Sequence, residues 1–185
     1  KVVFHDYPTI GKKGTFDRDE VWITNAYEEE TKRRLHARDS FRKLSNRFYW
    51  DDLSLLYFAG YACWNYISFP ILLTLPGVET KELPDWNENN EIWRRIAVRF
   101  PQDIPTHCKE QIYYFDEELK IVRHDYNPEI FASWARAAHY CYDHQIVDGL
   151  LIPSKRRVYP RTANNTSLGF PTLVWIDIKK VTLIR

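Results

Sequence analysis

The apolar residues of this chain follow two different periods. A helical period runs once at length, from Tyr49 to Leu73, where apolar side chains fall on nearly every side of a helical wheel. Asp51 or Asp52 supplies an N-cap oxygen before this run, and Pro70 cannot continue the hydrogen-bond ladder. The pattern therefore predicts one long helix over 52–69. Because a helix that is apolar nearly all round is buried on several sides, we expect it at the centre of the fold.

The two opposite sides of this predicted helix differ in size and polarity. One side carries mostly small residues and predicts close approach of a sheet: Leu56, Ala59, Gly60, Cys63 and Ile67. The opposite side carries polar groups and predicts a face toward solvent or a cavity mouth: Ser54, Tyr61, Asn65 and Ser68.

Alternation of period two predicts strands over most of the remaining chain. The predicted strands are 1–7, 19–25, 31–38, 78–83, 91–100, 106–115, 119–126, 137–147, 151–159 and 172–184. We expect turns at 8–16 and at Pro84-Asp85, and a short helix within 40–46. Short connections indicate antiparallel pairing. The predicted fold is mainly β (α+β), with a curved antiparallel sheet that forms an open or half barrel around the central buried helix.

Composition narrows the classes of protein that fit. The net charge is +1, from 26 basic and 25 acidic residues, so nothing indicates a nucleic-acid partner. The apolar run is short for a membrane span and is flanked by acidic residues, so we expect a buried helix instead. An odd count of cysteines without a CxxC motif predicts reduced thiols.

These features predict a single domain over 1–185 in the cytoplasm. The chain does not begin with Met, so a removed leader and a strand or helix upstream of Lys1 stay open. The oligomeric state also stays open.

A polar hairpin holds the residues best suited to chemistry. With a two-residue loop between 106–115 and 119–126, Glu110 faces Asp125 and Gln111 faces His124, while a three-residue loop places His124 opposite Glu110. In the first register Arg123 shares a face with both carboxylates, which indicates a salt-bridge network or a charged site.

Histidines on these strands offer a second kind of site. The candidates for acid–base catalysis are His124, Asp125, Tyr126 and His139, since histidine titrates near neutrality. Three imidazoles, those of His107, His124 and His139, suit a metal, but their spacing is not that of short-range ligands. We therefore expect hydrogen-bonded strand histidines, with no metal and no cofactor.

Several stretches resemble one known superfamily. The unit FDRDEVWITN, then the buried helix, then IWRRIAVRF and EQIYYFDEELKIVRHDY are similar to the lipoprotein-localisation-factor (LolA-like) half barrels. Residues 93–159 also resemble uncharacterised bacterial proteins with TH, EQ, YFD, RHDY and AHY runs. The resemblance implies a sheet curled round helices, a hydrophobic cavity, and the binding of lipids or other apolar ligands.

Two functions follow as expectations. The first is the binding of an apolar or amphipathic small molecule in a cavity between the helix and the sheet. Its predicted ligand-binding residues are Tyr57, Tyr61, Trp64, Arg94, Tyr113, His124, Tyr126 and Tyr140. The alternative is a small barrel-shaped lyase or isomerase that uses His, Asp and Tyr, so whether the chain catalyses a reaction stays open. A third option is a structural domain with a fully packed interior.

Overall fold

The computed structural model describes residues 1–42, 49–130 and 135–183. Its chain forms two compact units. The N-terminal unit comprises residues 1–72 and 102–107, and the C-terminal unit comprises residues 73–101 and 108–185. Each unit contains one antiparallel sheet, where the sequence predicted a single sheet. The predicted mainly β class and the antiparallel pairing are confirmed.

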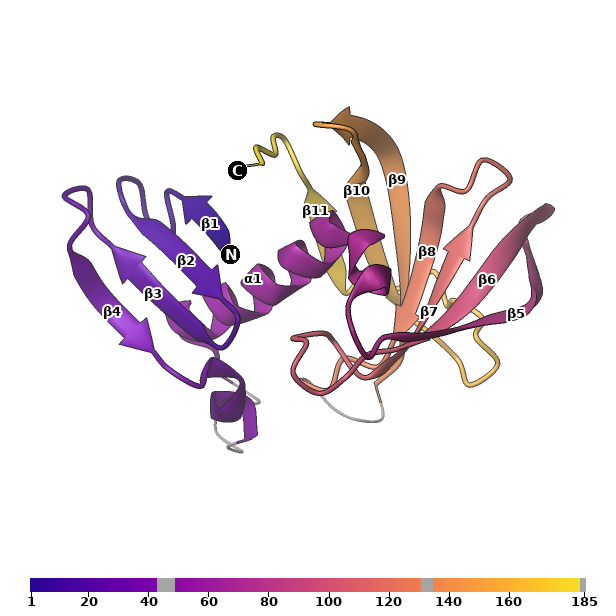
Figure 1. The fold of residues 1–185 in the computed structure, drawn as a ribbon, viewed down its shortest axis with the longest axis horizontal. Coiled ribbons are helices and arrows are strands. Elements are labelled where there is room, and N and C mark those ends of the chain that lie inside the picture. The colour runs from indigo at the N-terminus through magenta and orange to yellow at the C-terminus, as the bar shows by residue number, and fades with distance from the viewer. Residues whose placement is uncertain (43–48, 131–134, 184–185) are drawn as a thin grey trace. The chain divides into compact units, whose positions relative to one another are not determined.

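The N-terminal unit is a four-stranded sheet with a helix packed against it (Figure 1). Its strands follow the chain in the order β1 (Val2–His5), β2 (Lys13–Asp17), β3 (Glu20–Thr24) and β4 (Glu30–Arg34). The 3-10 helix η1 (Ala37–Arg42) and the helix α1 (Asp52–Ser68) follow. Val21 and Ile23 are buried on β3, as their alternation predicted, and β4 is the charged edge strand.

The bounds of α1 agree with the capping signals. The Asp51 carboxylate accepts a hydrogen bond from the Ser54 amide at 2.9 Å, which makes Asp51 the N-cap. The helix ends at Ser68, directly before the extended Phe69 that precedes Pro70. Proline disfavours the helical conformation in the residue that precedes it, so the sequence itself fixes this end of the helix.

The small side of α1 meets β2, as predicted. A Cβ atom built on Gly60 would lie 2.3 Å from the Cβ atom of Phe16, well inside van der Waals contact. Leu56 also lies close to Gly14, where an added Cβ atom would meet the Leu56 side chain at 2.8 Å. Glycines at two facing positions therefore let the helix and the strand approach.

The polar side of α1 is buried at Ser54, Tyr61 and Asn65, so these residues do not face solvent, which was the first of the two predicted surroundings. Residues 102–107, which belong to the same unit, meet this side. The Asn65 amide donates to the Pro105 carbonyl oxygen at 2.7 Å, and the Tyr61 hydroxyl lies 3.1 Å from Nδ1 of His107. Tyr61 and Asn65 are thus hydrogen-bonded to a distant segment of the chain, which sequence periodicity does not reveal.

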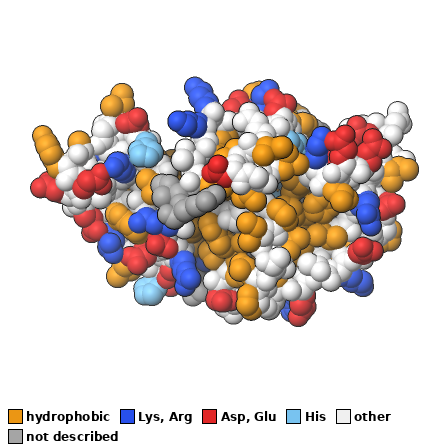
Figure 2. Space-filling view, turned by 45° about the horizontal axis from the view of Figure 1, so that its top comes forward, with side chains coloured by type: hydrophobic (Ala, Val, Ile, Leu, Met, Phe, Trp, Pro, Cys, Tyr) orange, Lys and Arg blue, Asp and Glu red, His pale blue; other side chains and the backbone are white. Residues whose placement is uncertain are grey.

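The C-terminal unit is a curved, open sheet of seven strands (Figure 1). After the 3-10 helix η3 (Ile71–Thr74), the strands are β5 (Glu79–Glu88), β6 (Glu91–Arg99), β7 (Glu110–Phe115), β8 (Ile121–Tyr126), β9 (Ala137–Val147), β10 (Leu150–Pro160) and β11 (Val174–Asp177). Each strand pairs with its neighbour in sequence. Hydrophobic side chains gather over this sheet on the face that Figure 2 shows.

Several predicted bounds differ from the structure. Residues 8–16, predicted as a turn, contain most of β2, because the segment from Lys13 gains hydrogen-bond partners on both β1 and β3. Pro84-Asp85 lies inside β5 as an irregularity between Leu83 and Trp86. The last predicted strand, 172–184, is reduced to β11, and residues 106–109 lie outside β7. Of the helix predicted within 40–46, residues 43–46 lie outside the described residues.

The seven-stranded sheet has two chemically different faces, because side chains alternate along each strand and cross-strand partners share a face. The arginine face carries Ile112, Tyr114, Arg123, Asp125 and Tyr140. The histidine face carries Gln111, Tyr113, His124, Tyr126 and His139.

The structure has the faces that the two-residue loop predicted, and not those of the three-residue loop, but neither predicted register is correct. Tyr113 lies opposite His124 and Ile112 opposite Asp125, a shift of two residues from the first predicted register. The reason is a longer turn, in which the Asp116 amide bonds to the Lys120 carbonyl oxygen and the pairing is irregular after Tyr114.

The contact between Gly60 and Phe16 predicts that a Gly→Ala substitution, which usually stabilises a helix, destabilises this one. Ala at an exposed helical Gly position stabilises a protein by about 1 kcal/mol. Gly60→Ala should instead lower the free energy of unfolding by about 1–3 kcal/mol, because the new methyl group overlaps the Phe16 side chain. Urea titration measures the change. In a Phe16→Ala background the loss should vanish, and a loss that persists there would refute the contact as its cause.

Asp51 predicts a pH-dependent contribution to stability. Burial opposes ionisation, yet hydrogen bonds from Arg34 and Ser54 lower the pKa of Asp51 to about 2. Because the folded pKa is depressed, the stabilisation is present above the unfolded pKa of about 3.9 and is lost as pH falls toward 2.

Asp51→Asn should therefore lower the free energy of unfolding at pH 7, by an amount that shrinks between about pH 4 and pH 2. Urea titrations at a series of pH values measure it. Asp85→Asn is the control, since no described residue forms an ion pair with Asp85. A constant Asp51→Asn effect from pH 7 to pH 2 would contradict the assignment.

Candidate functional site

The C-terminal unit holds two clusters of polar side chains, one on each face of its sheet. Both draw on β7, β8 and β9, the three neighbouring strands at the middle of the sheet. The hairpin β7–β8 supplies successive residues to opposite faces, so neighbours in the sequence belong to different clusters.

The histidine-face cluster consists of stacked rings. The rings of Tyr113 and His124 are stacked with centroids 4.2 Å apart and planes 9° from parallel. Tyr126 packs on His124 at 4.7 Å, and His139 lies 6.0 Å from both rings. All four side chains are buried.

Hydrogen bonds define the protonation of this cluster. Nε2 of His124 bonds to the Gln111 amide oxygen, which can only accept, so this nitrogen carries the proton. The Tyr113 hydroxyl donates to the same oxygen at 3.1 Å. Burial raises the pKa of Tyr113 above its ordinary value, with a smaller contribution from Cys108. Burial also raises the pKa of the Cys108 thiol to about 11, so Cys108 is protonated at neutral pH and is a poor nucleophile.

The arginine-face cluster is built around Arg123, whose side chain is fully buried. Its guanidinium donates to both oxygens of Asp125, from Nε at 2.7 Å and from Nη2 at 2.8 Å. It also bonds to the Glu88 carboxylate and to the Asn165 carbonyl oxygen. The network of arginine and carboxylates that the sequence indicated is therefore present, with Glu88 in the place expected for Glu110.

Aromatic rings surround the same guanidinium. Its central carbon lies 4.8 Å from the Tyr114 ring, 5.4 Å from the Tyr140 ring and 5.7 Å from the Trp86 ring. Such contacts stabilise a cation over the negative face of each ring, more so where water is excluded. The cluster thus compensates the buried charge by two carboxylates and three rings.

The charges of this cluster shift one another's pKa values. Burial lowers the pKa of Arg123, but the hydrogen bonds and charge of Asp125 outweigh it and raise that pKa above the ordinary value. Burial raises the pKa of Asp125, and Arg123 and Arg161 oppose that rise. Burial, together with a hydrogen bond to Glu88, raises the pKa of Tyr140. The raised pKa values keep Tyr114 and Tyr140 protonated at neutral pH.

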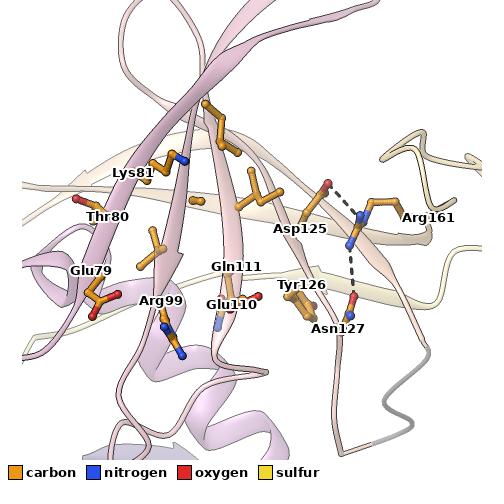
Figure 3. Close-up of a pocket in the computed structure, with 14 residues that line it drawn as sticks. Glu79, Thr80, Lys81, Arg99, Glu110, Gln111, Asp125, Tyr126, Asn127 and Arg161 are labelled. Atoms are coloured by element: carbon orange, nitrogen blue, oxygen red, sulfur yellow. Dashed lines mark hydrogen bonds and ion pairs between the residues drawn. The ribbon is translucent and has the colours of Figure 1, made fainter.

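A trough lies beside this cluster, across strands β5 to β8 (Figure 3). It has a volume of about 580 Å³. Its apolar floor is formed by Leu83, Ala97 and Ile112. Asp125 and Arg161 close one end, where Nε of Arg161 lies 3.4 Å from the Asp125 carboxylate.

Cross-strand register places the residues of the trough in rows. One row runs Lys81, Ala97, Ile112 and Asp125 across the four strands. The adjacent row places Arg99 between Glu79 and Glu110. The small Ala97 side chain between longer neighbours accounts for the hollow.

The predicted catalytic residues are divided between the two faces. His124, Tyr126 and His139 lie together on the histidine face, with the Tyr126 hydroxyl 3.4 Å from Nδ1 of His139. Asp125 lies on the arginine face, where Arg123 and the Tyr114 hydroxyl occupy its oxygens. The structure therefore does not bring Asp125 to the histidines.

The predicted ligand-binding residues are more widely distributed. Tyr57, Tyr61 and Trp64 belong to α1 in the N-terminal unit. There Tyr57 and Tyr61 are buried, and Trp64 is half-buried.

In the C-terminal unit, Tyr113, His124 and Tyr126 share the histidine face, while Tyr140 lies on the other. Arg94 is exposed on β6 and lies 3.9 Å from Glu82. Of the predicted residues, Tyr126 and Asp125 line the trough.

Sequence reasoning missed most of the trough and the aromatic enclosure of Arg123. In the observed register Lys81 and Ala97 lie on the same face of the sheet as Asp125, and this shared face identifies them as residues of the trough. The contribution of Asn165 and Arg161 had no sequence signal, because a loop brings them back to the sheet.

The three candidate metal ligands also separate. His107 belongs to the N-terminal unit, between the hydroxyls of Tyr61 and Tyr66. Within the described ranges no group of three or more His, Cys, Asp or Glu is placed to hold a metal ion. No disulfide joins the three cysteines, all of which are described. No helix in the described part of the chain is long and apolar enough to cross a membrane.

Comparisons with protein-family models, with curated proteins and with solved structures find no match to this chain.

The Arg123 network predicts a large cost for losing one partner. Asp125→Asn should lower the free energy of unfolding by about 3 kcal/mol, because it leaves a buried guanidinium with one fewer compensating charge. Asp177→Asn is the matched control, since Asp177 is half exposed in its pair with Arg157 and its loss should cost less. Urea titration compares the two variants, and equal losses would argue against the network as a stabilising centre.

Proposed function

We propose that this chain is a binding module that holds a small amphipathic molecule in the trough on the arginine face. The observation that carries the proposal is a hollow of about 580 Å³ with an apolar floor and charged ends. Small-molecule sites have volumes of about 300–1,000 Å³, with mostly apolar walls and a few polar groups that orient the ligand. The trough has a volume in this range and an apolar floor, with charged residues around that floor.

The wall nearest Arg123 is held in place before any ligand arrives. The Tyr114 hydroxyl donates to the Asp125 carboxylate at 2.8 Å, and the Arg123 guanidinium donates two further hydrogen bonds to the same carboxylate. A site whose side chains are already ordered loses less conformational entropy on binding. Rigid support of this kind favours a binding role for the trough.

A substitution that fills the trough tests the proposal. Ala97→Phe should weaken binding of the neutral, environment-sensitive dye Nile red by at least about tenfold, because the ring occupies the floor. Fluorescence titration measures the affinity, and circular dichroism confirms the fold. Ile146→Phe is the control, at an exposed site on β9 outside the trough. Unchanged dye binding by Ala97→Phe, or no binding by the wild type, would overturn the proposal.

An enzyme is the second candidate, and one observation favours it. His124, Tyr126 and His139 share a face, with a hydroxyl and an imidazole nitrogen 3.4 Å apart. Such groups suit acid–base chemistry on a lyase or isomerase substrate. An activity that survives Ala97→Phe but is lost in His124→Gln would favour this candidate.

The resemblance to the lipoprotein-localisation-factor half barrels stays a prediction. In such a half barrel a curved sheet surrounds a helix and leaves a cavity for lipids. The curvature of the seven-stranded sheet and the mainly β content support it (Figure 1). Pulsed electron paramagnetic resonance between spin labels at Leu55 and at exposed sheet positions would measure whether the sheet encloses α1. The expected cytoplasmic location likewise stays a prediction.

A further inference from the structure

We infer that the trough selects an elongated molecule with an anionic head, which lies at Lys81 while the apolar part crosses Ala97 and Ile112. This inference names the ligand class for the site and rests on the proposed binding function. It follows from the order of the side chains across the four strands.

The shape of the trough favours an elongated ligand. Its central row crosses β5, β6, β7 and β8, from Lys81 through Ala97 and Ile112 to Asp125. Neighbouring strands lie about 4.8 Å apart, so this row is about 14 Å long. Its two middle residues carry no polar side-chain atom, which suits a hydrocarbon segment.

The two ends of this row differ in charge compensation. Asp125 is compensated by the guanidinium groups of Arg123 and Arg161 and also accepts from Tyr114. An added cation at this end would have to compete with two arginines. The Asp125 end therefore presents no free negative charge to a ligand.

The Lys81 end is different. Its cross-strand partner is Ala97, which carries no charge, and no described residue accepts a hydrogen bond or forms an ion pair with its ammonium group. Figure 3 shows Lys81 and Asp125 on opposite sides of the pocket.

The flanking row carries two glutamates and one arginine, a net charge of −1, and both glutamates have Arg99 rather than Lys81 as their cross-strand partner. Glu79 and Glu110 stand directly opposite Arg99 on its two neighbouring strands, so these charges lie next to one another within the row. Opposite charges at facing positions in a sheet attract each other. An ammonium group beside an apolar floor then favours a carboxylate or phosphate head over a neutral or cationic one.

Three amphiphiles with the same chain test the head group. Calorimetric titration of the full chain with decanoate, decanol and decylamine should give the tightest binding for decanoate. Lys81→Gln should weaken decanoate binding about tenfold and leave decanol binding unchanged, because only the charged head loses a partner. Lys155→Gln is the matched control, a lysine on the same sheet that pairs with Asp143 outside the trough.

The outcomes separate this inference from the proposed function. If the three amphiphiles bind equally, or decylamine binds best, or Lys81→Gln keeps the wild-type affinity for decanoate, the anionic head is refuted while a binding trough survives. If no amphiphile binds the wild type, or Ala97→Phe leaves their binding unchanged, the trough itself is refuted as a binding site.

Discussion

The buried charge of Arg123 is the constraint on which the C-terminal unit depends. An uncompensated guanidinium in a dry interior is very costly, so the surrounding strands must supply carboxylates and ring faces at fixed positions. Asp125 comes from the same strand, Glu88 from the end of β5, and Asn165 from the loop after β10. One side chain thereby fixes three separate segments of the chain.

The same constraint shapes the trough. Because Arg123 and Arg161 neutralise Asp125, the end of the trough at β8 is electrically satisfied, while the Lys81 end is not. The floor between them is apolar and includes the small Ala97. A structural ion network and the proposed ligand site thus share one carboxylate, and the network makes the two ends of the trough different.

The N-terminal unit solves a different problem, that of packing a helix with polar groups on one side. Glycine at position 60 lets α1 approach β2 on the small side. Tyr61 and Asn65 on the polar side, together with Tyr66 beside it, bind His107 and Pro105, which belong to a segment about forty residues further along the chain. The hydroxyls of Tyr61 and Tyr66 and the amide nitrogen of Asn65 thus have partners in the same unit, so the helix is buried without an apolar surface all round.

The sequence by itself determined the local features of this protein. Capping by Asp51, termination before Pro70, the close approach at Gly60 and the alternation of the strands all depend on residues within one turn or one strand. That Arg123 and Asp125 share a face of their strand also followed from alternation alone. The tertiary structure decided the division of the strands into two sheets, the register of β7 and β8, and the location of the trough. Those features depend on turn geometry and on contacts between distant segments, such as Arg123 with Glu88 and Asn165, to which no short-range pattern in the sequence corresponds.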